Sequence, residues 1–356
     1  MSIIAVAARA SERRNPFVAL VPGLAITASI ATIAYLASHN IGFLKNYQMI
    51  MSIILGALVH NVLGTPAAAK EGAAFSLRRI LRFSIVLLGL QITAQQAIEV
   101  GGAGIAMIAT GLLATLLVTM VMGRVLGVPH GLSLLIGVGT SICGASAIIS
   151  AKAAVQGKDE DAAYAIASIT LFGTAAIFIY PIANGFLHLA PRDFGLWAGA
   201  SIHEVAQVVA TAFDGGPDAL RIGTIAKLTR VAMMAPVIIA IGEMGLRLGL
   251  GRADAKVRPP FPWFLIGFLA MVGVASFVAL PHTGDGVLDA PAVFVREHMG
   301  AISSGTAFLL SMAMGAMGMH ADIRHIRSNG IRPLLLGLLS TLFISLTTFA
   351  MIRFAV

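Results

Sequence analysis

The sequence has little charge and almost no cysteine. Charged residues make up 11% of the 356 residues, compared with about 25% in soluble domains. Hydrophobic residues reach 58% and the mean hydropathy is +0.90, so too few polar residues remain to cover a water-facing surface. The single cysteine, Cys143, excludes an internal disulfide and a site built from several thiolates. These shortages exclude a soluble domain and indicate a polytopic membrane protein.

Two other classes lack their usual signatures. The chain has no series of ten-residue alternating segments, which a membrane β-barrel would need, so we expect an all-α protein. The net charge of +8 comes from basic residues that are scattered between apolar runs. Proteins that bind nucleic acid instead gather basic residues into patches. We therefore expect no nucleic-acid partner and interpret the basic residues as setting the orientation of the chain in the lipid bilayer.

Eleven apolar runs are long enough to be membrane spans. A helix needs about 20 predominantly apolar residues to cross roughly 30 Å of hydrocarbon. The expected spans, numbered one to eleven, are 17–37, 47–63, 80–98, 102–121, 131–151, 162–185, 194–213, 222–246, 261–280, 301–320 and 333–353.

The basic residues predict the orientation of these spans. Sixteen Lys and Arg fall on the side of the N-terminus and six on the opposite side, while Lys227 and Arg230 lie inside span eight. Basic residues are retained on the cytoplasmic side. We therefore expect a multi-pass protein of the cytoplasmic (inner) membrane with a cytoplasmic N-terminus and an outside C-terminus.

The spans contain a weak internal repeat. The segment 56–62 in span two and the segment 199–205 in span seven are identical at four of seven positions, and fainter matches pair span three with eight and span five with ten. This predicts an N-terminal helix and tail in 1–45, a five-helix repeat in 46–190 and a second repeat in 191–356. Because five is odd, the second copy would be inverted, as in many secondary transporters. Chance similarity between helices rich in small residues stays open as the alternative.

Span five is rich in glycine and hydroxyl residues. These residues could allow close helix packing, or they could break the helix so that the N–H groups of a half-helix bind an anion. A similar Gly-Thr pair in span ten favours the second interpretation, so we expect spans five and ten to be crossed, discontinuous helices. The expected substrate ligands on the two spans are Gly139, Thr140, Ser141, Gly144, Ser146, Gly305 and Thr306.

Two basic residues lie inside span eight. Lys227 and Arg230 are three residues apart and therefore on one helix face. Burying each charge costs about 2.5 to 3.5 kcal/mol on insertion scales, so each should meet a negative group. We expect them to bind the substrate, with Glu204 or a bound anion as the negative partner. A purely structural ion pair between Arg230 and Glu204 is the alternative.

Span seven carries an acid and an imidazole. His203, Glu204 and Gln207 are the expected ion-coupling residues, since His titrates near neutral pH and intramembrane acids are rare. An intramembrane zinc protease would need His-Glu-x-x-His, and position 207 is glutamine. We therefore expect no enzyme, catalytic residue, metal or cofactor, and an intramembrane hydrolase is the weakest alternative.

Three motifs carry a family resemblance. The segments 139–147, 200–208 and 227–231 resemble the bacterial YeiH-type family of proposed sulfate exporters, and the resemblance covers nearly the whole chain. That family is grouped with the cation/proton antiporter and bile-acid symporter superfamily. The resemblance implies inverted five-helix repeats with two crossed, unwound helices, here spans five and ten. The antiporters carry carboxylates at the crossing, whereas 131–156 and 299–321 contain no Asp or Glu.

These observations predict a secondary active transporter of a small anion that works by alternating access. Sulfate, sulfite and organosulfur anions are the expected substrates. Export is favoured because a dianion that leaves a cell held at about 100 mV inside-negative gains about 4.6 kcal/mol. A cation/proton antiporter or a sodium-coupled symporter is the alternative. The expected partners are the anion, a proton or sodium ion and the lipid bilayer, and the sequence permits a homodimer.

Overall fold

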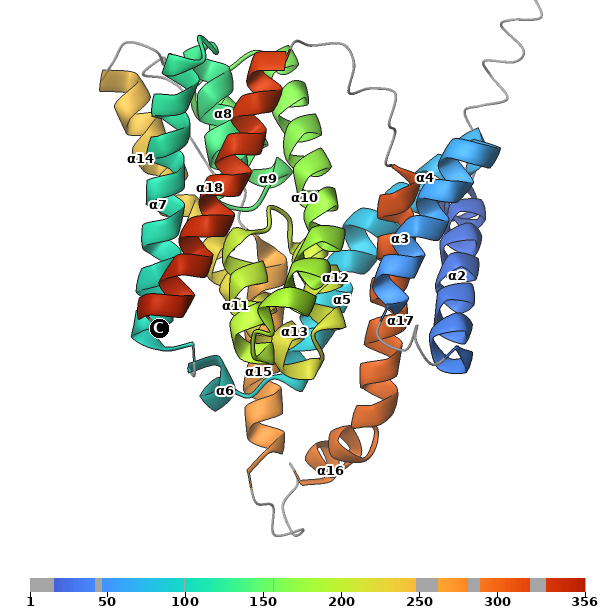
Figure 1. Ribbon diagram of the computed structural model, residues 1–356. Coiled ribbons are helices and arrows are strands. Elements are labelled where there is room, and N and C mark those ends of the chain that lie inside the picture. The colour runs from blue at the N-terminus through green and yellow to red at the C-terminus, as the bar shows by residue number, and fades with distance from the viewer. Residues whose placement is uncertain are drawn as a thin grey trace, which may run out of the picture. The chain divides into compact units, whose positions relative to one another are not determined.

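The chain folds into helices throughout the part that the structure describes. The computed structural model describes residues 16–41, 47–98, 100–155, 157–247, 262–280, 289–320 and 331–355. Within these ranges six helices are long and apolar enough to cross a membrane, and shorter apolar helices accompany them (Figure 1). The prediction of an all-α polytopic membrane protein is confirmed.

The helices form two compact units. The first unit contains α2 (Pro16–Asn40), α3 (Gln48–Leu58), η3 (Val59–Leu63), η4 (Ala67–Ala69), α4 (Lys70–Phe75), η5 (Ser76–Ile80), most of α5 (Leu81–Leu88) and α17 (Met299–Met319). The second unit contains η6 (Gly89–Gln91), α6 (Ala94–Ile98), α7 (Gly101–Val125), α8 (His130–Ser141), α9 (Ala145–Val155), α10 (Asp159–Leu187), α11 (Pro191–Ser201), α12 (Val205–Asp214), α13 (Pro217–Ala232), α14 (Met234–Arg247), α15 (Trp263–Val278), α16 (Asp289–Glu297) and α18 (Ile331–Ala355).

Each of the eleven expected spans coincides with one helix or with consecutive helices. The outer faces of the long helices are apolar, as lipid contact requires. On α7, for example, Leu113, Leu117, Val121 and Val125 are all exposed. These residues are spaced four apart and therefore form one stripe along the helix.

Small residues allow two helices of the first unit to pack closely. A Cβ atom at Gly56 of α3 would lie 2.0 Å from the carbonyl oxygen of Gly315 on α17, and one at Gly318 would lie 2.1 Å from that of Ile53. The side-chain amide of Gln48 donates to Ser311 Oγ at 2.8 Å in the same interface. Figure 1 shows α3 running alongside α17. Close backbone approach and buried polar bonds are the forces that hold helices together in lipid.

This packing predicts unequal effects of two Gly-to-Ala changes. Gly56→Ala places a methyl group on a backbone oxygen, so we expect it to destabilise the first unit by about 1–3 kcal/mol. Gly305→Ala on α17 is the control, because a Cβ atom there meets nothing within 4 Å and alanine favours a helix by about 1 kcal/mol. Thermal unfolding in detergent measures both. Equal losses in the two variants would contradict the close-packing interpretation.

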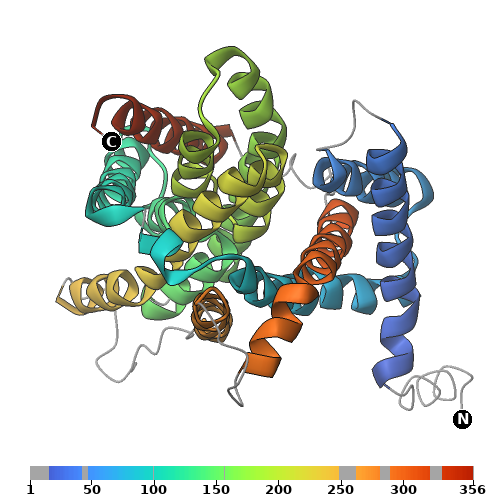
Figure 2. The same cartoon turned by 90° about the horizontal axis from the view of Figure 1, so that it is seen from below.

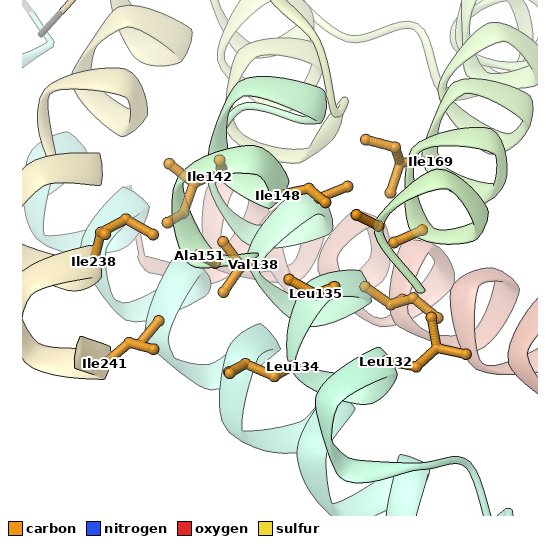
Figure 3. Packing of buried hydrophobic residues seen from close by; sticks show 14 of the residues in the cluster. Leu132, Leu134, Leu135, Val138, Ile142, Ile148, Ala151, Ile169, Ile238 and Ile241 are labelled. Atoms are coloured by element: carbon orange, nitrogen blue, oxygen red, sulfur yellow. The ribbon is translucent and has the colours of Figure 1, made fainter. Parts of the chain in front are cut away.

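The core of the second unit surrounds a broken helix. Buried side chains of α8 and α9, including Leu135 and Ile148, pack against Ile169 of α10 and Ile238 of α14 (Figure 3). The helices α7 and α18 also pack against α8, and they lie next to each other in both views (Figures 1 and 2). Both halves of span five thus pack against neighbouring helices.

The structure confirms one predicted break and corrects the other. Span five consists of α8 and α9, which are separated at Ile142–Gly144. The expected break in span ten is wrong, because α17 is one continuous helix over Met299–Met319. Span seven is also broken, since α11 and α12 are separated at Ile202–Glu204, and span three is interrupted at Ile92–Thr93, between η6 and α6. The predicted pairing of the two repeats stays a prediction, but the broken helices do not occupy equivalent positions within it.

The glycines of α17 have a different role from Gly144. Gly144 has a φ of +76°, a backbone conformation that favours glycine, whereas no described residue of α17 has a positive φ. Gly315 and Gly318 instead allow the close contacts with other helices of the first unit. The composition of span ten therefore reflects helix packing, which was the alternative interpretation for segments of this kind.

Candidate functional site

The breaks in spans five and seven lie side by side in the second unit, joined by residues of α13. Span five is interrupted after Ser141, and its second half begins at Ala145. Span seven is interrupted after Ser201, and its second half begins at Val205. Each half-helix leaves unpaired carbonyl groups at one end of the break and unpaired N–H groups at the other.

Lys227 of α13 bonds to both breaks. Its fully buried ammonium group donates to the carbonyl oxygens of Ile142 and Ile202, each at 2.8 Å, and to that of His203. A lysine nitrogen has three hydrogens only when it is charged. The three carbonyl partners therefore identify Lys227 as an ammonium ion with all of its donors in use.

Arg230 donates hydrogen bonds to the carboxyl ends of both α8 and α11. At the end of α8, its Nε donates to Ser141 O at 3.0 Å and its Nη2 to Thr140 O at 2.5 Å. At the end of α11, its Nη1 donates to Ile202 O at 2.9 Å and to Gly199 O at 3.4 Å. The guanidinium group is 1% exposed, so these carbonyls replace the water that it would otherwise bind.

The positions of the two cations follow from helix electrostatics. The last turn of a helix carries roughly half a negative charge, and its carbonyls lack partners within the helix. Lys227 and Arg230 are one turn apart on α13 and reach the carboxyl ends of α8 and α11 together. Neither of them forms an ion pair with Glu204 among the described residues, so the predicted partner of the cations is replaced by backbone carbonyls.

Glu204 lies at the opposite, positive ends of the breaks. It caps α12, because its carboxylate accepts from the backbone N–H of Gln207 while the Gln207 side chain accepts from the Glu204 N–H at 3.0 Å. The carboxylate also accepts from the N–H of Ala145, the first residue of α9. Gly144 makes room for this contact, since a Cβ atom there would lie 2.6 Å from Glu204 Cγ. The Glu204 carboxylate therefore accepts hydrogen bonds from the amino ends of both α9 and α12.

Several buried polar atoms beside the breaks have no hydrogen-bond partner among the described residues. They are Thr140 Oγ1, Ser141 Oγ, His203 Nδ1 and Gln207 Nε2. An unpaired buried polar group costs about 1–3 kcal/mol. Groups of this kind are expected where a ligand or ordered water completes the bonding.

A rigid polar and aromatic cluster fixes the end of α11. Tyr180 of α10 bonds through its hydroxyl to Ser201 Oγ at 2.7 Å and to Ser345 Oγ of α18 at 2.8 Å. Trp197 stacks on Tyr180 with ring centroids 4.0 Å apart and donates to Ser345 O at 3.0 Å. The carboxyl end of α11 is thereby tied to α10 and α18.

Cys143 lies within the first break. Its half-buried thiol is 3.6 Å from the sulfur of Met234 on α14. Among the described residues, no group of three or more His, Cys, Asp or Glu could hold a metal ion.

The structure brings most of the predicted site residues together. Those at the breaks are Thr140, Ser141, Gly144, His203, Glu204, Gln207, Lys227 and Arg230. Gly139 is a packing position, since a Cβ atom there would lie 2.7 Å from Ile148 Cδ1, and Ser146 is exposed. Gly305 and Thr306 belong to α17 in the other unit, and the Thr306 hydroxyl donates to Ile302 O within the helix at 2.7 Å.

Two contributors to the site were not among the predicted residues. Thr341 of α18 contacts His203 Nε2 at 3.0 Å, and Gly173 of α10 makes room for the Gln207 amide. A threonine or serine in an apolar span gives no signal of its own. The glycine in the middle of span six could have indicated a close approach.

Two broken helices whose polar ends meet beside buried charges are typical of secondary transporters. The fold and the site thus define a polytopic, all-helical membrane protein of the transporter type.

The chain belongs to the family described as Conserved hypothetical protein 698, which matches residues 22–337. It is 36% identical over 302 residues to a UPF0324 membrane protein of Pseudomonas putida, covering 83% of this chain and 82% of the relative. A UPF0324 membrane protein of Pseudomonas aeruginosa is 35% identical over 333 residues, covering 90% of both chains. One from Bacillus cereus is 32% identical over 336 residues, covering 93% of this chain and 90% of the relative. No solved structure matches the chain. The resemblance to the YeiH-type family is confirmed.

Proposed function

We propose that the protein is a secondary active transporter of a small inorganic or organosulfur anion, such as sulfate or sulfite, which binds beside the two helix breaks. The observation that carries this proposal is an excess of positive charge at the breaks. Lys227 and Arg230 are the only charged side chains that are fully buried in the described part of the chain, and Glu204 is the only carboxylate bonded to the breaks.

The charges at the breaks can be counted. The carboxyl ends of α8 and α11 contribute about one negative charge together, and the amino ends of α9 and α12 about one positive charge. Lys227 and Arg230 add two positive charges and Glu204 adds one negative charge. The sum is an excess of about one positive charge inside the protein, which a buried site needs to neutralise. A bound anion would do so.

The unpartnered atoms supply the hydrogen bonds for an anion. The Gln207 Nε2 group can only donate, and the hydroxyls of Thr140 and Ser141 can donate as well. Both hydroxyl residues also present their backbone carbonyls to Arg230, so the donors lie next to the excess charge. Gly144 would contribute by shaping the break in span five, while Gly139, Ser146, Gly305 and Thr306 stay proposed ligands from the sequence alone.

Coupling is assigned to His203, Glu204 and Gln207. Glu204 holds the amino ends of α9 and α12 while it is ionised, and a proton on it would weaken both contacts. In the proposed cycle, the protein lies in the inner membrane with a cytoplasmic N-terminus and works by alternating access. The membrane potential drives the anion outward, and a proton or sodium ion is coupled to its transport.

A cation/proton antiporter is the second candidate, because Glu204 is a carboxylate in the middle of a membrane protein and such groups often carry protons or cations. The geometry favours the anion. Lys227 and Arg230 already occupy six carbonyl oxygens at the breaks, which are the ligands that a sodium ion would use in an unwound helix.

The proposal predicts that stability and anion binding respond in opposite directions to Thr140→Val. The change removes a buried hydroxyl that has no partner in the described structure, so we expect the protein without anion to gain about 1 kcal/mol of stability. Binding of sulfate or sulfite should weaken about tenfold, since one donor is lost.

The matched control is Thr224→Val on α13. This hydroxyl is also buried but already donates to Leu220 O at 2.7 Å, so anion binding should not change. The measurements are thermal shift with and without anion, and uptake of labelled sulfate or sulfite by proteoliposomes. If no anion binds to the wild-type protein and none is transported, the proposed function is wrong.

A further inference from the structure

The hydrogen-bond pattern around His203 assigns a tautomer to its imidazole. His203 Nε2 lies 3.0 Å from Thr341 Oγ1, and the same hydroxyl donates its single hydrogen to Gly337 O at 2.8 Å. Both contacts are satisfied together only when Nε2 carries the hydrogen and donates to the threonine oxygen. The second nitrogen, Nδ1, is then a hydrogen-bond acceptor. It is buried and has no partner among the described residues.

The capping arrangement fixes the neighbouring amide in the same way. Gln207 Oε1 accepts from the Glu204 N–H, so Nε2 of this amide is the atom left without a partner. Nε2 is a donor only. His203 and Gln207 therefore present one unpaired acceptor and one unpaired donor, four residues apart in the chain, at the break in span seven.

The ligand must satisfy both kinds of atom. An anion oxygen can accept from Gln207 Nε2 and from the hydroxyls of Thr140 and Ser141, but it offers nothing to an acceptor. An oxyanion without hydrogen would place negative oxygens against the lone pair of His203 Nδ1. An anion that still carries one O–H group can donate that hydrogen to Nδ1 while its other oxygens accept.

The charge at the breaks points to the same species. The excess is about one positive charge when the imidazole is neutral, which one negative charge on the ligand neutralises. A dianion would leave a net negative charge in a buried site. A charged imidazole could offset it, but a third cation would then lie next to Lys227, whose ammonium group donates to His203 O.

We infer that the site selects singly charged oxyanions that carry one O–H group, such as hydrogen sulfite, and that His203 Nδ1 accepts the hydrogen bond from that group. Thr341 is a positioning residue, because it fixes the tautomer of His203 and does not itself meet the anion. This inference rests on the proposed anion transport and adds the protonation state of the substrate.

Pairs of anions of equal shape and charge test the inference. Hydrogen sulfite and methanesulfinate differ by a hydroxyl in place of a methyl group, as do hydrogen carbonate and acetate. Binding to the full-length protein in detergent is measured by thermal shift and calorimetry, with sulfate as the dianion. The sulfur pair is measured at mildly acidic pH, where hydrogen sulfite predominates, and the carbon pair at mildly alkaline pH, where hydrogen carbonate does. We expect each hydroxyl-bearing anion to bind about tenfold more tightly than its methyl partner, since the methyl compound leaves Nδ1 unpaired.

The variant Thr341→Val tests the tautomer. Valine has the shape of threonine but cannot accept from Nε2–H, so the imidazole is free to carry its hydrogen on Nδ1. We expect the tenfold preference for the hydroxyl-bearing anions to disappear. The methyl anions should bind as tightly as they do to the wild type, or more tightly. The control is Thr348→Val on the same helix, where the buried hydroxyl donates to Ile344 O at 2.6 Å. Its preference should equal that of the wild type.

The outcomes separate this inference from the proposed function. If anions bind and are transported but the two members of each pair bind equally, the inference is overturned and the anion transporter stands. The same conclusion follows if Thr341→Val keeps the full preference. If none of the anions binds to the wild-type protein, the proposed function itself fails.

Discussion

Arg230→Gln is expected to abolish anion transport and to lower the free energy of unfolding by about 3–5 kcal/mol, because it breaks a buried charge network. The guanidinium group bonds to four carbonyl oxygens at the ends of α8 and α11, and glutamine can serve at most two of them. The loss of its charge also removes the excess positive charge at the breaks. Thermal unfolding in detergent and labelled-anion flux in proteoliposomes measure the two effects.

Two further variants separate folding from function. Arg221→Gln on the same helix is the control. Its ion pair with the exposed Asp218 carboxylate, at 3.3 Å, contributes less than about 1 kcal/mol, and its hydrogen bond to Gln96 O, at 3.3 Å, lies away from the breaks in spans five and seven. Arg230→Lys keeps the charge but not the fork of donors, so it should lose stability and still bind anion. Transport at the wild-type rate by Arg230→Gln would rule out the charge-based account.

Glu204→Gln is expected to shift selectivity toward dianions. The change keeps an oxygen that can accept from the backbone N–H groups of α9 and α12, but it raises the excess charge at the breaks from about one to about two. Two like charges about 6 Å apart interact by roughly 3 kcal/mol at an effective dielectric constant of 20, so the ratio of sulfate to methanesulfonate binding should rise at least tenfold. Calorimetry in detergent measures this ratio.

The control for Glu204→Gln is Glu243→Gln, which neutralises an exposed carboxylate on α14 and should leave the ratio unchanged. The variant also distinguishes the two candidate functions. If Glu204→Gln abolishes exchange of sodium ions for protons, and the wild-type exchange needs no anion, the antiporter is the better description.

The sequence predicted most of the membrane architecture, because long apolar runs can hardly be anything other than spans. All eleven runs coincide with helices. The break in span five was also predictable, since Gly144 has a backbone conformation that favours glycine. The break in span seven was not predictable from glycine, because Ile202–Glu204 contains none. It is stabilised by contacts from α13, which lie 25 residues or so further along the chain.

In the site, too, the residues themselves could be predicted from the sequence, whereas their partners in distant parts of the chain could not. Lys227, Arg230 and Glu204 were identifiable because charges inside apolar runs are rare. Their partners were not, since backbone carbonyls carry no signal in the side-chain sequence. The Glu-x-x-Gln pattern of Glu204 and Gln207 is a capping signature that marks a helix start. This signature predicts that a helix begins after Glu204, and therefore predicts the break that the structure shows there.

The position of Cys143 has a practical consequence. It is the single thiol of the chain and it lies in the break between α8 and α9. A fluorescent or spin-labelled maleimide would therefore report on this one point of the native protein, without any engineered cysteine or background labelling. Reagents that cannot cross the bilayer, added from either face, would show from which compartment the centre of the transporter is open.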